Sequence, residues 1–413
     1  MLYSCNVTSK EELPSAVVVI GAGYVGIPLA ITASKANSMV ILYDHDSDKC
    51  KSLQESKSGI NDSVDRDLQI LQQRNILKIC DYITIQQIKE SYFIKTIVIC
   101  VPTPLQNDKS PDLSMVINAS EFAIDLMNQS TLIILESSTY PGTTREIIYP
   151  MIKAKFSDLP DEKILLGYSP ERIDPGNNVW DSSNTPRLVS GINKPSTKSI
   201  EDFYGNCGII THSVKSIEIA EAAKLFENTF RLVNIAFVNE FVEVVRRIGL
   251  DPQEILEAAY TKPFGIMKFK SSPGIGGHCI PIDPYYLTWW ATKFSEELKI
   301  VKAAQKANED MPNSVLNRVK RQLGSELKGK AVVLIGVTYK PKIRDARETP
   351  AEGIWRILED CGCKLYWWDS LLNEWKGRER FKPSVDEIDL ALIVTPTKVD
   401  FQISEENILD LNL

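Results

Sequence analysis

A glycine-rich loop that presents a single cysteine is the segment best suited to covalent chemistry. Residues Gly274–Asp283 read GIGGHCIPID, so the carboxylate of Asp283 follows the thiol of Cys279 by four residues. A thiolate is a strong nucleophile, and glycines let a backbone approach a bulky ligand closely. A cysteine is more often a small buried hydrophobe, but a glycine-rich loop is a poor place to build a core. We therefore interpret Cys279 as a candidate nucleophile.

A second set of polar residues falls on one stripe of a predicted long helix. Residues 216–250 lack proline, have no glycine before Gly249, and repeat apolar residues at helical spacing. Lys224, Asn228 and Arg231 lie at positions i, i+4 and i+7 of this helix. We expect the helix to be buried on most faces, so its cations need partners. An anionic ligand is one candidate. Internal salt bridges are the alternative, with Glu221, Glu227 or Glu240 as partners.

A dinucleotide-binding pattern opens the chain. The apolar run Ala16–Ile20 precedes a Gly-x-Gly-x-x-Gly motif, and a second apolar run, Met39–Tyr43, ends at Asp44. Gly21 permits the turn, Gly23 lets a pyrophosphate approach, and Gly26 lets the helix pack on the strand. A carboxylate after the second strand accepts from ribose hydroxyls and repels a 2′-phosphate, so the pattern favours NAD over NADP. Asp44 is the candidate, and Asp46 is its nearest competitor.

The order of elements predicts an α/β protein. Further buried-strand runs occur at 96–101, 132–135 and 164–166, with helical segments between them, which is typical of a parallel sheet covered on both faces. Helical patterns follow at 216–250, from Asp251-Pro252 onward, and across 284–323. Strand patterns return at 330–336, 364–369 and 390–395. We predict two Rossmann-like doubly wound domains joined by a central helical domain. The boundaries are 1–208, 209–322 and 323–413.

Composition limits the class of protein. The 413 residues carry a net charge of −7 and no long Lys/Arg run, which argues against nucleic-acid binding. Eight scattered cysteines without a CxxC pair indicate reduced thiols, and hence a cytoplasmic location. The uncharged stretch 16–33 contains the glycine motif and Pro28, so we interpret it as strand, turn and helix, not as a membrane span. His278 and Cys279 lack further clustered ligands, so no metal site is expected.

Seven motifs, in order, resemble those of the UDP-glucose/UDP-N-acetylhexosamine 6-dehydrogenases along nearly the whole chain. They are Val19–Gly26, Cys100–Pro104, Glu136–Gly142, Ser169–Gly176, Glu221–Glu240, the Cys279 loop and Tyr339–Glu348. The resemblance implies a UDP-binding C-terminal domain and a central domain that forms a homodimer or a higher homo-oligomer.

The resemblance also implies a four-electron oxidation that consumes two NAD⁺. The sugar C6 hydroxyl becomes an aldehyde, Cys279 traps it as a thiohemiacetal, a second hydride transfer gives a thioester, and water releases the carboxylate. Lys224 and Asp283 would manage protons and a water, and Lys224 with Asn228 would stabilise the oxyanion. Glu171 would be the base for thioester hydrolysis. Thr139 would orient a water or the nicotinamide.

Binding residues follow from the same motifs. The residues implied for NAD are Gly21, Gly23, Tyr24, Val25, Gly26, Asp44, Lys49, Pro102, Thr103, Thr139 and Arg347. The residues implied for the substrate are Glu171, Arg172, Lys224, Asn228, Arg231, Gly276 and Lys340.

The sequence of the Cys279 loop indicates which UDP-sugar is the substrate. His278 before the thiol, together with Lys262–Gly265 and Tyr285–Trp289, resembles the UDP-N-acetylglucosamine enzymes, and this substrate is favoured. UDP-N-acetylmannosamine, UDP-N-acetylgalactosamine and UDP-glucose are alternatives. Arg344 stands where the family usually has an acid, and 366–395 looks shortened. A two-electron dehydrogenase and a non-catalytic nucleotide-sugar-binding homologue are the competing hypotheses.

Overall fold

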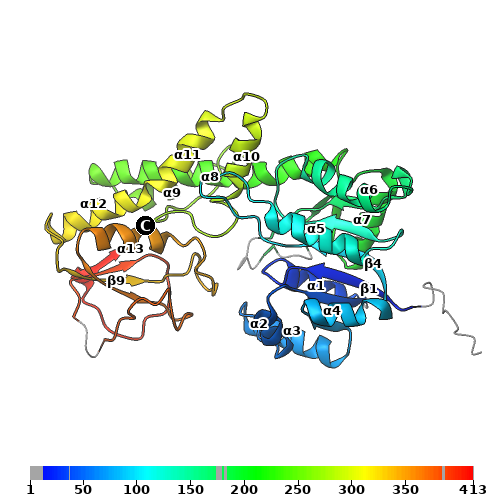
Figure 1. Cartoon of the computed structure of the whole chain (residues 1–413). Coiled ribbons are helices and arrows are strands. Elements are labelled where there is room, and N and C mark those ends of the chain that lie inside the picture. The colour runs from blue at the N-terminus through cyan, green and yellow to red at the C-terminus, as the bar shows by residue number, and fades with distance from the viewer. Residues whose placement is uncertain (1–12, 37, 174–178, 181–183, 384–386, 413) are drawn as a thin grey trace, which may run out of the picture. The chain divides into compact units, whose positions relative to one another are not determined.

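The computed structural model describes residues 13–36, 38–173, 179–180, 184–383 and 387–412. Cys5 and residues 174–176 of the Ser169–Gly176 motif lie outside the described residues. The chain divides between Leu225 and Phe226 into an N-terminal and a C-terminal compact unit. Figure 1 labels the elements of both units.

The N-terminal unit is built on an eight-stranded sheet in the order β3-β2-β1-β4-β5-β6-β7-β8. Its strands are β1 (Ser15–Ile20), β2 (Met39–Tyr43), β3 (Leu77–Cys80), β4 (Phe93–Ile99), β5 (Leu132–Leu135), β6 (Leu166–Tyr168), β7 (Arg187–Gly191) and β8 (Thr211–Ser213). The order of the first six strands is that of the Rossmann fold. The sheet confirms the α/β prediction.

The sheet differs from the predicted parallel sheet at one pair. Strand β7 runs antiparallel to β6, whereas the other neighbours are parallel. An apolar strand has the same pattern in either direction, so the sequence could not reveal this reversal. Strand β6 also begins at Leu166, two residues later than the run that we expected.

Helices cover both faces of this sheet. They are α1 (Gly26–Lys35), α2 (Ser47–Gln54), α3 (Asp62–Gln73), α4 (Tyr82–Ile88), α5 (Ser114–Leu126), α6 (Tyr149–Lys155) and α7 (Lys194–Asn206). Alternate residues of β1 belong to two separate cores: Val18 and Ile20 to one, Val17 and Val19 to the other. This alternation confirms the prediction that both faces are covered.

Helix α8 (Ile217–Arg247) is a single helix of 31 residues that continues from the first unit into the second. Its length confirms the sequence prediction. The expected burial on most faces is wrong for the single chain, because Phe226, Phe237 and Val244 are 67%, 66% and 60% exposed. Helical spacing indicates which residues share a face, but not whether that face is covered.

The C-terminal unit continues with four helices. They are α9 (Pro252–Ala259), α10 (Asp283–Thr292), α11 (Lys299–Glu309) and α12 (Met311–Leu323). Asp251 caps α9 through the N–H of Gln253, as its Asp-Pro sequence predicts. The single helical stretch expected over 284–323 is instead three helices. Ser295 adopts a positive φ of 59° after α10, and Pro312 begins a new helix because it cannot donate to the preceding turn.

A second parallel sheet completes this unit, in the order β10-β9-β11-β12. Its strands are β9 (Ala331–Ile335), β10 (Lys364–Trp368), β11 (Leu390–Ile393) and β12 (Ile408–Asp410), with α13 (Pro350–Asp360) between β9 and β10. Val332 and Leu334 pack into one core, Val333 and Ile335 into another. The predicted return to a strand–helix pattern is confirmed.

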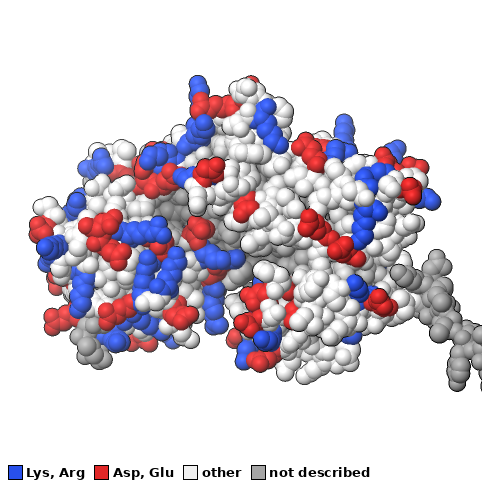
Figure 2. Space-filling model, in the orientation of Figure 1, with Lys and Arg blue, Asp and Glu red and all other residues white. Residues whose placement is uncertain are grey.

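Charge is mixed on the surface. On the face shown in Figure 2, Lys and Arg side chains are interspersed with Asp and Glu. Within the described residues, none of the helices combines the length and the apolar character needed to cross a bilayer.

Candidate functional site

The glycine turn between β1 and α1 is packed so tightly that two of its glycines cannot be replaced. Gly21 has a φ of +102°, and a Cβ there would lie 2.6 Å from the carbonyl oxygen of Cys100. A Cβ on Gly26 would lie 1.9 Å from the carbonyl oxygen of Gly21. Gly23, in contrast, has no atom within 4 Å of its Cβ position. The middle glycine therefore leaves open space beside the start of a helix, where an anion is stabilised.

Asp44, at the end of β2, is fixed against this turn. Its Oδ2 accepts the N–H of Ala22 at 2.8 Å and the ammonium of Lys49 at 2.9 Å. Burial raises the pKa of Asp44, but Lys49 and the backbone N–H groups of Ala22 and Asp46 outweigh it, so the pKa lies below its ordinary value. The side chain is thus an oriented carboxylate. Its competitor, Asp46, instead caps α2 by accepting from Asp48 and Lys49.

These features fit a dinucleotide. The open space at Gly23 admits a pyrophosphate against backbone N–H groups, and Asp44 offers an acceptor for a ribose. Tyr24 and Val25 lie in the same turn, and Pro102 with Thr103 follows the neighbouring strand β4. Lys49 is paired with Asp44, so its predicted contact to the adenosine half stays a prediction.

Thr139 lies in the segment after β5. It is fully buried, and its Oγ1 has no hydrogen-bond partner among the described residues. The same segment is fixed by Glu221 of α8, whose Oε2 accepts the N–H of Gly142 at 2.6 Å and whose Oε1 accepts from Thr144. Glu221 therefore holds the segment after β5, and this role replaces the salt bridge to Lys224 that was one alternative. An orphaned hydroxyl on a fixed loop is suited to contact a bound ligand or water.

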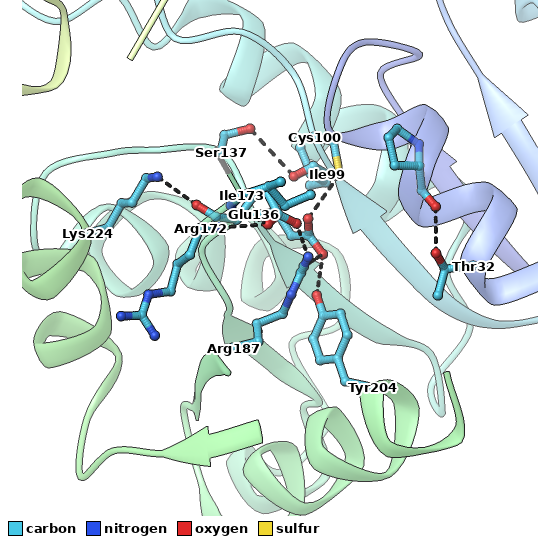
Figure 3. Close-up of polar contacts among 12 residues, drawn as sticks. Thr32, Ile99, Cys100, Glu136, Ser137, Arg172, Ile173, Arg187, Tyr204 and Lys224 are labelled. Atoms are coloured by element: carbon cyan, nitrogen blue, oxygen red, sulfur yellow. Dashed lines mark hydrogen bonds and ion pairs between the residues drawn. The ribbon is translucent and has the colours of Figure 1, made fainter. Parts of the chain in front are cut away.

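Lys224 and Glu171 meet in the N-terminal unit. The Lys224 ammonium donates to the backbone carbonyl of Glu171 at 2.6 Å, and the lysine is only 8% exposed (Figure 3). Arg172, next to Glu171, donates to the carbonyl of Pro186 at 2.7 Å. The predicted base is therefore anchored through its main chain by the predicted proton-handling lysine.

The thiol loop is anchored to α8 in the C-terminal unit. Asp283 begins α10, and its N–H donates to the carbonyl of Cys279 at 2.8 Å. Its carboxylate accepts from Asn228 at 2.6 Å, and both side chains are buried. Cys279 itself is partly exposed. The structure thus brings three predicted residues together.

Two glycines of the thiol loop pack closely against other residues of the C-terminal unit. A Cβ on Gly276 would lie 2.7 Å from both the carbonyl oxygen of Glu348 and the Cδ of Pro350. A Cβ on Gly277 would lie 3.0 Å from the ring of Tyr339. The glycines let the loop pack against 339–350 of its own unit. Protein atoms fill the space where a Cβ would lie at these two positions, and the approach of a ligand to the backbone of this loop stays a prediction.

The other residues implied for binding lie nearby in the same unit or on α8. Arg347 pairs with Asp345 at 2.7 Å, and its guanidinium lies 3.5 Å from Nδ1 of His278. Lys340 and Arg231 are partly exposed. Their roles stay predictions.

A cavity of about 300 Å³ borders the first half of the thiol loop. Its lining includes Gly274, Ile275, Glu348, Glu352 and Lys376. Charges of both signs line it, so it has no clear preference for an anion.

Sequence reasoning missed a buried ionic cluster in the N-terminal unit. Arg187 forms ion pairs with Glu136 and Glu171, and Tyr204 donates to Glu136 (Figure 3). Glu136 lies inside one of the motifs, yet no role followed from it. A signal was present, because an arginine opens strand β7 and is followed by the apolar residues Leu188 and Val189.

Comparisons with known proteins agree with this geometry. Residues 15–207 match the NAD binding domain of the UDP-glucose/GDP-mannose dehydrogenase family, and residues 218–310 match the central domain of that family. A UDP-N-acetyl-D-glucosamine 6-dehydrogenase of Pseudomonas aeruginosa is 35% identical over 92% of this chain and 87% of its own.

Two further proteins are similar over most of their length. A UDP-N-acetyl-D-glucosamine 6-dehydrogenase of Salmonella typhi is 32% identical over 89% of this chain and 84% of its own. The structure of the UDP-D-ManNAc dehydrogenase of Pyrococcus horikoshii is 27% identical, with a TM-score of 0.80, over 92% of this chain and 89% of that one.

Proposed function

Because the chain belongs to the UDP-glucose/GDP-mannose dehydrogenase family, we propose that it oxidises C6 of a UDP-N-acetylhexosamine to the carboxylate through a thioester on Cys279. The family is one of NAD-dependent oxidoreductases, and NAD is the cofactor of this chain. The nicotinamide, when bound, accepts a hydride in each of the two oxidations.

The N-acetylhexosamine is the substrate class that the relatives support. Two relatives above 30% identity carry the name UDP-N-acetyl-D-glucosamine 6-dehydrogenase, and a structural neighbour is a UDP-D-ManNAc dehydrogenase. The loop around Cys279 also resembles the N-acetylglucosamine enzymes. We propose UDP-N-acetylglucosamine as the substrate, with UDP-N-acetylmannosamine as the first alternative.

The anchored thiol is the observation that carries the proposal. Cys279 adds to the C6 aldehyde, which forms a C–S bond and a thiohemiacetal whose hydroxyl carbon still holds a hydride to give. Asn228 and Lys224 stabilise negative charge on the C6 oxygen. Asp283, which accepts a hydrogen bond from Asn228, takes up the proton of this oxygen together with Lys224. Loss of the second hydride gives the thioester.

Hydrolysis completes the reaction in the proposal. Glu171 takes a proton from water as the water oxygen attacks the thioester carbon, and the C–S bond breaks to return the Cys279 thiolate. Lys224 holds the main chain of Glu171 and balances the oxyanion. Thr139, with its unpaired hydroxyl, orients the water or the nicotinamide.

Binding roles follow the family motifs. Arg172, Arg231 and Lys340 contact the diphosphate of the sugar nucleotide, and Gly276 contributes backbone groups. Arg347 contacts the pyrophosphate of NAD, and Lys49 contacts its adenosine half. These cations would give an acidic chain the local positive charge that a phosphorylated substrate needs.

The test is the ratio of NADH to product on a panel of UDP-sugars. We expect two NADH for each sugar acid, with the highest kcat/KM for UDP-N-acetylglucosamine. A Cys279→Ser variant should still bind the UDP-sugar but form no acid. One NADH for each product would indicate a two-electron dehydrogenase, and no NADH with any UDP-sugar would indicate a binding protein. Either result would refute the proposal.

A further inference from the structure

Arg187 joins two acidic side chains in the interior of the N-terminal unit. Its Nη1 pairs with Oε1 of Glu136, and its Nη2 pairs with Oε2 of Glu171. The Arg187 side chain is 4% exposed, that of Glu136 is fully buried, and that of Glu171 is 13% exposed. One guanidinium therefore bridges a buried carboxylate and the carboxylate that we propose as the base.

The topology of the sheet brings these residues together. Glu136 follows β5, and Glu171 follows β6, so both lie at the carboxyl edge of parallel strands. Strand β7 runs antiparallel to β6, so its first residue, Arg187, lies at that same edge. The reversal of β7 thus places a cation where two strands deliver carboxylates.

Tyr204 and Cys100 complete the surroundings of the Arg187–Glu136 pair. Tyr204 donates its hydroxyl to Oε1 of Glu136, and its ring centroid lies 4.7 Å from the Arg187 guanidinium carbon. Cys100 lies with its sulfur 3.7 Å from Oε2 of Glu136. Burial, and next the Glu136 charge, raise the pKa of the Tyr204 hydroxyl and of the Cys100 thiol, so both stay protonated and donate. The guanidinium therefore has one defined orientation (Figure 3).

The hydrogen bonds to the Glu171 carboxylate indicate which of its two oxygens is able to accept a proton from water. Oε1 accepts the N–H groups of Arg172 at 2.7 Å and Ile173 at 2.9 Å, which uses both of its lone pairs. Oε2 accepts from Arg187 alone among the described residues, which leaves one lone pair for a water.

We propose that Arg187 is a positioning residue that orients Oε2 of Glu171 toward the hydrolytic water. This inference rests on the proposed function, because it assigns Glu171 to thioester hydrolysis. Arg187 acts in hydrolysis and not in the two hydride transfers. A purely structural ion pair would instead affect every step, or only stability.

The experiment follows NADH in a stopped-flow instrument after NAD⁺ is mixed with whichever UDP-N-acetylhexosamine the wild-type enzyme turns over. The variant is Arg187→Lys, which keeps the charge but replaces a planar fork of fixed N–H directions by a shorter side chain with a single ammonium. We expect a burst of two NADH per active site at the wild-type rate, followed by a steady state slowed by about tenfold or more. The enzyme quenched with acid in that state should carry the thioester on Cys279.

A double-mutant cycle separates positioning from structure. Glu171→Gln should also slow hydrolysis, and adding Arg187→Lys to it should slow hydrolysis no further, because the arginine acts through that carboxylate. Arg145→Lys is the matched control, since Arg145 pairs with Glu218 at 2.6 Å in the same unit and should leave both phases unchanged.

Three results would overturn the inference. They are an Arg187→Lys effect that adds in full to that of Glu171→Gln, an equal slowing of the burst and the steady state, and wild-type kinetics in Arg187→Lys. A failure of the proposed function looks different, because the wild-type enzyme itself would then form no acid or would yield one NADH per product.

Discussion

Asn228 of α8 donates a 2.6 Å hydrogen bond to the carboxylate of Asp283, and both residues are at most 5% exposed. The N–H of Asp283 in turn donates to the carbonyl of Cys279. A long helix thereby fixes the residue that ends the thiol loop. This hydrogen bond is one of the contacts that hold the thiol loop, together with the packing of Gly276 and Gly277 against 339–350.

Removing that amide should reduce both stability and turnover. Asn228→Ala leaves the buried Asp283 carboxylate without this donor, which should lower the free energy of unfolding by about 1–3 kcal/mol. Loss of the proposed oxyanion contact should lower kcat by about 100-fold. Urea unfolding and steady-state kinetics measure the two effects.

Asn234→Ala is the control for this change. Asn234 lies on the same helix, and among the described residues its side chain donates to the carbonyl of Phe230 in the preceding turn. We expect kcat to stay near the wild-type value in this variant. An equal loss of activity in both variants would mean that general damage to α8, and not the contact to Asp283, explains the result.

The open space at Gly23 predicts a change in cofactor binding without a change in fold. Gly23→Ala introduces a methyl group that meets no protein atom within 4 Å, so thermal stability should be kept. The methyl group would occupy the position of the pyrophosphate, and the Kd for NAD⁺ should rise by about tenfold or more, about 1.4 kcal/mol. Calorimetric titration with NAD⁺ measures this shift.

Gly205→Ala is the matched control, since its Cβ also meets open space but lies on α7. It should bind NAD⁺ like the wild type. Unchanged NAD⁺ affinity in Gly23→Ala would place the pyrophosphate elsewhere.

Glu221 predicts a pH dependence of stability. Burial raises the pKa of Glu221 from 4.5 to about 7. The folded protein therefore holds a proton, between about pH 4.5 and 7, that the unfolded chain has lost. Stability from this group is fully present below about pH 4.5 and is lost as pH rises through 7. The difference corresponds to about 3 kcal/mol at 1.36 kcal/mol per pH unit.

Unfolding free energies measured from pH 5 to 8 test this sign. Glu221→Gln should flatten the decrease over this range. Glu218→Gln is the control, because Glu218 is partly exposed and its pKa lies below its ordinary value, so it titrates below this range. A decrease of the same size in Glu221→Gln and wild type would assign the pH dependence to other groups.

The exposed apolar side of α8 predicts an interface between copies of this chain. Phe226, Phe237, Val244 and Ile248 are each at least 60% exposed, and such a patch is unusual on a monomer. We propose a homodimer or a higher homo-oligomer that covers it. Phe237→Glu should shift the mass toward the monomer in light scattering, whereas Ile83→Glu on α4, also exposed, should not. A wild-type protein that is monomeric at micromolar concentration would contradict the proposal.

Local sequence patterns predicted much of the fold and part of the site. The glycine turn and Asp44 are joined by one strand–helix–strand unit, so their spacing in sequence defines their spacing in space. The spacing of Lys224 and Asn228 on one helix was predictable for the same reason. The contact between Asn228 and Asp283 is long-range; the resemblance implied roles for both residues but did not predict that they contact each other.

The remaining features depend on tertiary structure. Strand β7 reverses direction, so nothing in the sequence places Arg187 beside Glu136 and Glu171. The close packing of Gly276 against the backbone of Glu348 is also a long-range contact that the sequence does not show. Close packing within the chain and room for a bound ligand both require glycine, so the sequence does not distinguish the two.

The covalent state of Cys279 during turnover tests the central claim most directly. Wild-type and Glu171→Gln enzymes are quenched with acid in the presence of NAD⁺ and the UDP-sugar, and their peptides are mapped by mass. We predict a hydroxylamine-sensitive acyl group on the peptide that contains Cys279, at higher occupancy in Glu171→Gln. An unmodified Cys279 peptide in both enzymes while sugar acid accumulates would contradict the account.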